Sequence, residues 1–221
     1  AELWTLANAA EAGSDNQFQL VNAYLGYGEE GDAEFAANVR GLLDGTVTLD
    51  GLDIDNDMRW ALVKALASVN QIDEAGIDTE LAKRDTTANR EFAMGARASR
   101  STAEAKEWAW NEAIRNQELT NMQLEAVARG FAGATPELAD PYVERYFAEA
   151  DWIWTNRTFH MAEALLEGLW PVYADPAKLV EQGDTWLASH AEADNAFRRI
   201  VIGNLESARR SLKVRDWNAA L

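Results

Sequence analysis

Residues 51–99 read GLDIDNDMRWALVKALASVNQIDEAGIDTELAKRDTTANREFAMGARAS, and this stretch decides the fold class. Its first half carries apolar residues at intervals of three or four, which is the spacing of one helical face. These residues are Met58, Leu62, Ala65, Leu66 and Val69. A second apolar strip on the same segment consists of Trp60, Val63 and Ala67. A helix that is apolar on two sides must be covered on two sides, so we expect it to lie between neighbouring helices.

Short polar residues in this stretch predict where its helices begin. Asp53 or Asp55 is expected to cap the first helix, because a short carboxylate accepts hydrogen bonds from the free N–H groups of the first turn. Asp73 is expected to open a second, shorter helix, and the run 85–87 (Asp-Thr-Thr) a third.

The spacing Asp53-x-Asp55-x-Asp57 also resembles the start of a calcium-binding loop. Such a loop needs Gly at its sixth position and Glu at its twelfth, where this sequence has Met58 and Lys64. We therefore interpret these aspartates as helix caps.

The composition is that of a helical chain with a sizeable core. Of 221 residues, 48% are apolar, and only four prolines and 14 glycines interrupt the chain. This length allows one large domain or two small ones. The sequence contains no cysteine, which excludes disulfides, a cysteine nucleophile and thiolate zinc sites in this chain. The lack of cysteine fits a reducing compartment, and we expect a cytoplasmic location.

The formal net charge of −17 restricts the partners. An acidic surface repels polyanions, so nucleic acid and anionic membranes are not expected to bind. No run of 18 apolar residues is present, and the sequence therefore predicts no membrane span.

Cap and proline signals mark further helix starts along the chain. Ser14 with Gln17, and Ser101 with Glu104, have the spacing of a capping box. Thr120 or Asn121 is expected to start another helix. A cap followed by proline, with proline as the first helical residue, occurs three times, at 135–136, 140–141 and 175–176.

In total the pattern predicts about a dozen short helices and no strand. Helices of this length on short connections stack as antiparallel pairs. We therefore predict an all-α fold, an α-solenoid of antiparallel helix pairs similar to a HEAT or armadillo superhelical bowl. No composition shift marks a boundary, so residues 1–221 are expected to form a single helical-repeat domain.

Two side chains were weighed as metal ligands. His160 and Glu163 stand three residues apart on one predicted helix, but the only other histidine is His190. This set is poor for zinc, and the sequence predicts no metal site.

Nine tryptophans raise the question of sugar binding. Four of them lie at apolar positions within predicted helices, which favours a role in the core: Trp4, Trp60, Trp108 and Trp186. Trp152 and Trp154 are expected in a turn.

The last predicted helix, from about Asp194, is basic although the chain is acidic. Its cations are Arg198, Arg199, Arg209, Arg210, Lys213 and Arg215. We interpret this helix as one that docks on an acidic neighbour, with charge suited to a helix C-terminus.

Six segments together resemble the C-terminal domain of bacterial zinc aminopeptidase N. They are GLDIDNDMRWALVKAL (51–66), IDTELAKRDTT (77–87), ARASRSTAEAK (96–106), PYVERYF (141–147), IWTNRT (153–158) and EGLWP (167–171). The resemblance covers about Asp44 to Arg215 and rests on the order and spacing of these segments. The sequence departs from the pattern at His160-Met161.

The resemblance implies a bowl of HEAT-like helices that caps the peptide chamber and limits substrate access. It also implies a parent enzyme that removes N-terminal residues from peptides. In that family an HExxH motif with a downstream Glu holds zinc, and a GxMEN-type loop grips the substrate amine. These belong to a preceding catalytic domain, which is the implied partner together with the peptide substrate. None of these motifs occurs here, so we expect no catalytic, cofactor-binding or metal residue in this chain, and no activity from it alone.

Arg157 is the candidate peptide-facing residue, and a surface or interhelical salt bridge is its alternative role. For the whole chain, the alternative function is a free-standing helical-repeat adaptor that binds protein. The helical pattern already at residues 1–4 (Ala-Glu-Leu-Trp) favours a fragment of a larger protein.

Overall fold

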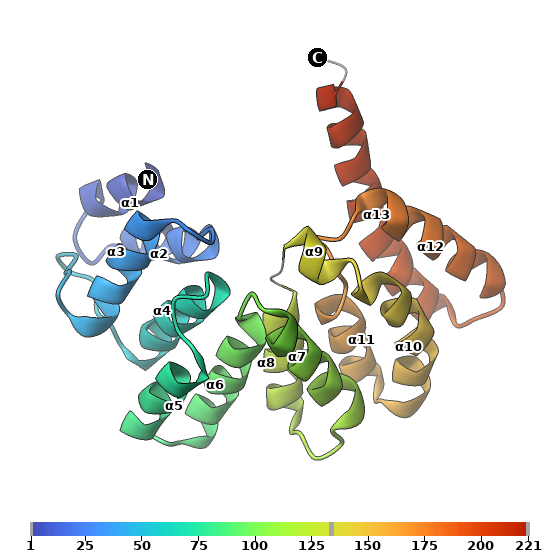
Figure 1. Ribbon diagram of the computed structural model, residues 1–221, viewed down its shortest axis with the longest axis horizontal. Coiled ribbons are helices and arrows are strands. Elements are labelled where there is room, and N and C mark those ends of the chain that lie inside the picture. The colour runs from blue at the N-terminus through green and yellow to red at the C-terminus, as the bar shows by residue number, and fades with distance from the viewer. Residues whose placement is uncertain (1, 133–134, 220–221) are drawn as a thin grey trace. The chain divides into compact units, whose positions relative to one another are not determined.

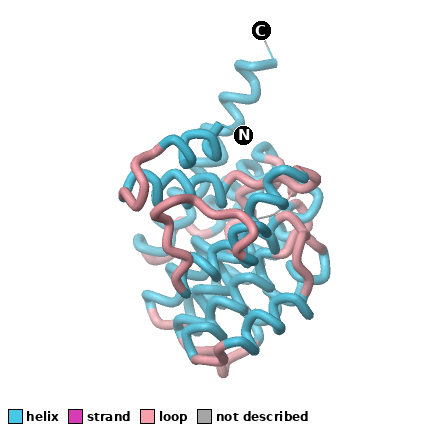
Figure 2. Tube along the Cα trace, turned by 90° about the vertical axis from the view of Figure 1, so that its left-hand side faces the viewer, coloured by secondary structure: helices cyan, strands magenta, loops and turns pink. Residues whose placement is uncertain are grey.

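The computed structural model describes residues 2–132 and 135–219, and these fold as helices joined by loops, with no strand among them (Figures 1 and 2). The all-α prediction is confirmed. The chain divides into two compact units, residues 1–101 and 102–221. The expectation of one continuous domain over residues 1–221 stays a prediction.

The first unit contains six helices in two layers. They are α1 (Glu2–Ala9), α2 (Asp15–Gly26), α3 (Ala33–Asp44), α4 (Asn56–Ser68), α5 (Glu74–Lys83) and α6 (Thr87–Ser99). One layer runs α2, α4, α6, because α4 contacts both of the others. The second layer consists of α1, α3 and α5, each packed against the next helix of the chain. This is the stacking of helix pairs that the solenoid prediction requires.

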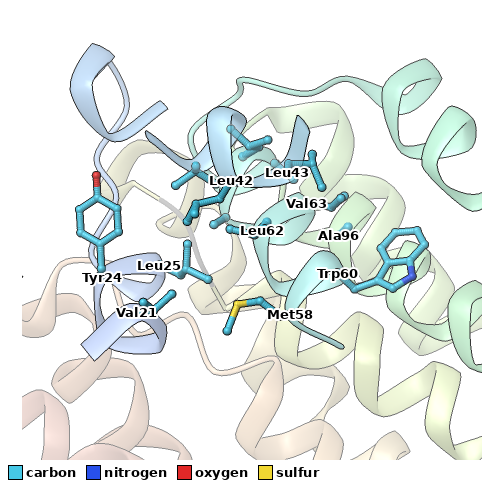
Figure 3. Packing of buried hydrophobic residues seen from close by; sticks show 14 of the residues in the cluster. Val21, Tyr24, Leu25, Leu42, Leu43, Met58, Trp60, Leu62, Val63 and Ala96 are labelled. Atoms are coloured by element: carbon cyan, nitrogen blue, oxygen red, sulfur yellow. The ribbon is translucent and has the colours of Figure 1, made fainter. Parts of the chain in front are cut away.

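Helix α4 is the centre of the first unit. Leu62, Val63 and Leu66 are fully buried, and Trp60 is buried on the second apolar strip. Figure 3 shows Leu62 and Val63 among Leu42 and Leu43 of α3, Leu25 of α2 and Ala96 of α6. The prediction that this helix is covered on two sides is confirmed.

The second unit repeats the two-layer pattern. Its helices are α7 (Ala103–Arg115), α8 (Asn121–Phe131), α9 (Pro136–Ala139), α10 (Tyr142–Asn156), α11 (Phe159–Gly168), α12 (Pro176–Ser189) and α13 (Asn195–Ala219). Helix α11 contacts α8 and α13, and these three form one layer. Against them pack α7, α10 and α12, in the pairs α7–α8, α10–α11 and α12–α13.

Most predicted caps are confirmed by the local geometry. The side chains of Asp55 and Asp73 accept hydrogen bonds from the backbone N–H groups three residues later. Ser14 caps α2 in the same way, but the predicted box is not complete, because the Gln17 side chain accepts from the N–H of Gly13 instead of that of Ser14. Thr120 and Gln123 form the complete, reciprocal capping box of α8.

The predicted capping box at Ser101 is wrong. Thr102 is the N-cap of α7, and its hydroxyl accepts from the N–H of Ala105 at 3.2 Å. Ser101 is held elsewhere, because its backbone N–H and carbonyl both bond to the side chain of Asn70. Pro141 also differs from the prediction, since it is the N-cap of α10 rather than its first helical residue.

Trp152 and Trp154 lie within α10 and not in a turn, so the prediction of a turn there is wrong. The ring of Trp154 stacks on Phe197 of α13 with 4.9 Å between centroids. This contact gives the last turns of α10 a packing partner, so the helix continues to Asn156. Among the described residues, no helix combines the length and apolar character that crossing a membrane requires.

Candidate functional site: two grooves flanking α11

Two neighbouring grooves run along the layer of the second unit that contains α8, α11 and α13. The first has a volume of about 470 Å³ and lies between α8 and α11. The second, of about 290 Å³, lies between α11 and α13. We call the surface formed by both the groove face. Its residues are Glu125, Arg129, Ala132, Phe159, His160, Glu163, Ala164, Glu167, Gly168, Ala196, Arg199, Ile200, Gly203 and Asn204.

The sequence of α11 explains why its outer side contributes to both grooves. Met161, Ala162, Leu165 and Leu166 are buried at helical spacing. Glu163 lies between these residues and Glu167 follows them, so both are left on the other side of the helix.

Helices α8 and α11 approach each other closely at Gly168. A Cβ atom at this position would lie 2.7 Å from the Cβ of Ala128. Glycine is therefore required here by space, and the small residues keep the base of the first groove narrow.

The carboxylates of the groove face differ in their partners. Glu125 accepts a hydrogen bond from Arg129 at 2.7 Å, and His160 Nε2 lies 3.2 Å from its second oxygen. Glu163 and Glu167 have no ion pair with any side chain that the structure describes. Like charges four residues apart destabilise a helix by about 0.2–0.5 kcal/mol, so this pair brings no gain in folding stability.

The second groove is also lined by a basic side chain and by apolar ones. Arg199 of α13 is exposed, and Phe159 presents an aromatic ring that is 54% exposed. A ligand with a cationic group would meet the Glu163 and Glu167 carboxylates, while its apolar part would contact Phe159 and Ile200. The arrangement is therefore suited to binding and contains no evident nucleophile paired with a base.

A buried polar cluster joins three helices of this site, α10, α11 and α13. The phenol of Tyr146, on α10, donates to the carbonyl of Leu166 at 2.8 Å. The amide of Asn204, on α13, donates to the same carbonyl at 3.1 Å and to the Tyr146 oxygen at 3.3 Å. Burial raises the pKa of the Tyr146 phenol well above its usual range, so the hydroxyl stays a neutral donor.

Arg157 lies outside the groove residues, at the C-terminal end of α10. Its guanidinium donates to the carbonyl of Ala113 on α7 at 3.2 Å and stands 5.4 Å from the ring centroid of Trp152. Burial lowers the pKa of Arg157, and its Nε is buried without a hydrogen-bond partner. The structure thus gives Arg157 an interhelical contact, and its role in facing peptide stays a prediction.

The two histidines lie at different places in the second unit. His160 pairs with Glu125, and His190 Nε2 lies 2.9 Å from a carboxylate oxygen of Asp151. In the part of the chain that the structure describes, no three ligating side chains come together as a metal ion requires. These residues do not fit a zinc site.

Of the groove residues, the sequence pattern indicates Glu163 only as a partner of His160, and it does not indicate a role for Glu167 or Asn204. The repeat of glutamate at 163 and 167 was a usable signal, because residues four apart share a helical face. Asn204 gave no signal, since its partners are 38 and 58 residues away.

The tryptophan predictions are largely supported by burial. Of the four predicted for the core, Trp60 and Trp186 are buried, and Trp4 is half-buried against the core of the first unit. Trp108 is also half-buried, and the fully buried indole of α7 is Trp110.

Comparison with known proteins identifies the domain. The family model described as the ERAP1-like C-terminal domain matches residues 1–210. Aminopeptidase N of Streptomyces lividans is 36% identical over 219 residues, which is 98% of this chain and 25% of that protein. The chain thus spans about a quarter of the length of this curated relative. These matches confirm the resemblance drawn from the six sequence segments, and the chain belongs to the family of ERAP1-like C-terminal domains.

Proposed function

We propose that this chain is the C-terminal domain of a zinc-dependent aminopeptidase, and that it caps the peptide chamber and limits substrate access. The family match and the name of the Streptomyces lividans relative support this proposal. That relative is about four times as long, which leaves room for a catalytic domain in the rest of the polypeptide. In this proposal the zinc and the catalytic residues belong to that other part, and the protein is cytoplasmic.

The groove face is the part of the domain that we assign to the chamber wall. The main support is that two carboxylates without an ion-pair partner, Glu163 and Glu167, line both grooves, and that Phe159 lines the second one with them. In this arrangement the carboxylates attract cationic side chains of the bound peptide, at positions beyond the bond that is cleaved. Short substrates do not reach the groove face, so the effect is confined to longer peptides.

The test uses the full-length protein with the double substitution Glu163→Gln and Glu167→Gln. We compare kcat/KM for two peptides that differ by lysine or norleucine at a distal position, and for a single-residue chromogenic amide. Two partly exposed ion pairs at about 0.5 kcal/mol each correspond to a loss of about fivefold in kcat/KM for the lysine peptide. The norleucine peptide and the amide should be hydrolysed as before.

The matched control is the double variant Glu181→Gln and Glu192→Gln. It removes the same charge from two exposed positions that do not line either groove. If both double variants lower kcat/KM for the lysine peptide equally, the loss comes from the change in the protein's net charge, and the groove face has no special role.

Membership in a larger polypeptide is tested separately, by detecting the native protein with an antibody against this chain. A species several times heavier than 24.5 kDa is expected. A species near 24.5 kDa without a larger form would overturn the proposal and favour the alternative, an adaptor that binds protein.

A further inference from the structure

The C-terminal part of α13 extends past the contacts that hold the helix in the second unit. The buried residues of α13 are Phe197, Val201, Leu205 and Ala208, and every described side chain after Ala208 is partly or fully exposed. Figures 1 and 2 show this end of the helix projecting beyond the rest of its unit. We call residues 210–219 the α13 extension. The family match ends where it begins, at residue 210.

One side of the α13 extension is both apolar and basic. Val214 is 58% exposed and Trp217 is 65% exposed. Arg210 and Lys213 share their side of the helix, because positions 210, 213, 214 and 217 recur at intervals of three and four. Val214 follows Leu205 by nine residues, which at about 100° per residue places it opposite the buried side.

The other side of the α13 extension is tied to its own unit. Within the extension, Arg215 donates to Asp175 at 2.8 Å, and just before the extension Arg209 pairs with Asp184 of α12. These ion pairs orient the helix. The side with Val214 and Trp217 therefore points away from the second unit in a defined direction.

An exposed tryptophan flanked by cations on a projecting helix is typical of the centre of a protein interface. The cations favour an acidic partner surface. Nucleic acid is a poor partner, because the net charge of −17 repels polyanions.

The surface formed by Arg210, Lys213, Val214 and Trp217 is small. Its size favours a contact within one polypeptide over a contact with a second copy of the protein. A stable interface between separate proteins buries about 1,200–2,000 Å², which four side chains on two helical turns do not supply. A contact within one chain needs far less area, because tethering gives effective concentrations of about 1 mM. The Streptomyces lividans relative has three quarters of its length outside the matched region, which could provide such a surface.

We propose that the α13 extension docks, through Arg210, Lys213, Val214 and Trp217, on an acidic surface with an apolar centre in the remaining part of the same polypeptide. This inference rests on the one element of the proposed function that places the chain in a longer protein. It does not depend on the chamber or on zinc.

The experiment measures thiol accessibility in the full-length protein. The chain contains no cysteine, so Val214→Cys introduces one thiol that is identified by peptide mapping after maleimide labelling. Tyr173→Cys is the matched control, because Tyr173 is 54% exposed and is not on α13. Each rate is divided by the rate of the same variant in concentrated urea. We expect Cys labelling at 214 to be at least about tenfold slower than at 173.

Charge reversal and salt test the stated chemistry of the partner. The added substitutions Arg210→Glu and Lys213→Glu, or about 1 M salt, should raise the rate at 214 toward that at 173. Equal rates at 214 and 173 in the unmodified background would overturn the proposal. Labelling at position 214 that becomes slower as the protein concentration rises would also overturn the proposal, since the surface would then be covered by a second copy of the protein. Aminopeptidase assays are not part of this readout, so its failure is distinct from a failure of the chamber role.

Discussion

The side-chain amide of Asn70 pairs with the backbone of Ser101, 31 residues later in the chain. Nδ2 donates to the carbonyl oxygen at 2.8 Å, and Oδ1 accepts from the N–H at 3.1 Å. Asn70 itself has a φ of 55°, a left-handed conformation that favours glycine and asparagine. Asn70 thus turns the backbone just after α4, and its side chain fixes the position of Ser101, just before α7.

Replacing Asn70 tests both properties. Asn70→Ala should lower the free energy of unfolding by about 2–3 kcal/mol, from the strained φ and the loss of the side-chain hydrogen bonds to Ser101 and Glu30. Asn70→Gly keeps the φ and should lose only about 1–2 kcal/mol. Urea unfolding of both variants measures the difference. If both variants lose the same free energy of unfolding, the left-handed φ at position 70 does not destabilise the alanine variant.

The position of the α7 cap leads to a second prediction. Thr102→Ala should lower the free energy of unfolding by about 1 kcal/mol, because its hydroxyl caps the Ala105 N–H. Ser101→Ala should change it by less than about 0.5 kcal/mol, because Ser101 is bound through its backbone. Thermal unfolding of the two variants is the measurement. A larger effect at Ser101 would contradict the observed cap.

Glu80 leads to a pH prediction in the first unit. Its carboxylate is 7% exposed and accepts hydrogen bonds from Arg59 and Lys83. Burial alone would raise the pKa of Glu80, but the hydrogen bonds from Arg59 and Lys83 outweigh it and lower the pKa. The folded protein therefore holds the charged form, and the stabilisation is present above the ordinary carboxyl pKa of about 4.3. It is lost as the pH falls through the lowered pKa of the folded state.

The variant Glu80→Gln isolates this contribution. It should be less stable than the parent by about 2 kcal/mol near neutral pH, since a buried charge-assisted cluster is broken. The difference should shrink below about pH 4. Unfolding by urea across this pH range measures it. A difference that does not vary with pH would mean that packing, and not the charge, accounts for the loss.

Arg157 is tested for structure and function together. Arg157→Ala should destabilise the domain by about 1–2 kcal/mol, because it removes the hydrogen bond to Ala113 and the contact with the Trp152 ring. A peptide-facing role predicts in addition a lower kcat/KM in the full-length protein for long peptides than for short ones. Unchanged specificity constants for both lengths would refute that role and leave the structural one.

The sequence by itself determined the helical class, most of the helix starts and the family. These features depend on interactions over three or four residues, such as the caps at Asp55 and Asp73 and the apolar faces of α4. Short-range geometry is the same in every helix, so a pattern in the sequence is enough to predict it. The order of the six matching segments was likewise a property of the sequence alone.

Only the tertiary structure decided where the unpaired carboxylates Glu163 and Glu167 lie and which of two neighbouring residues caps α7. Glu163 and Glu167 lie between two grooves because α8 and α13 pack on either side of α11. The cap moved from Ser101 to Thr102 because Asn70 binds the Ser101 backbone. Each of these outcomes joins residues about 30 or more apart, and local spacing carries no information about such contacts.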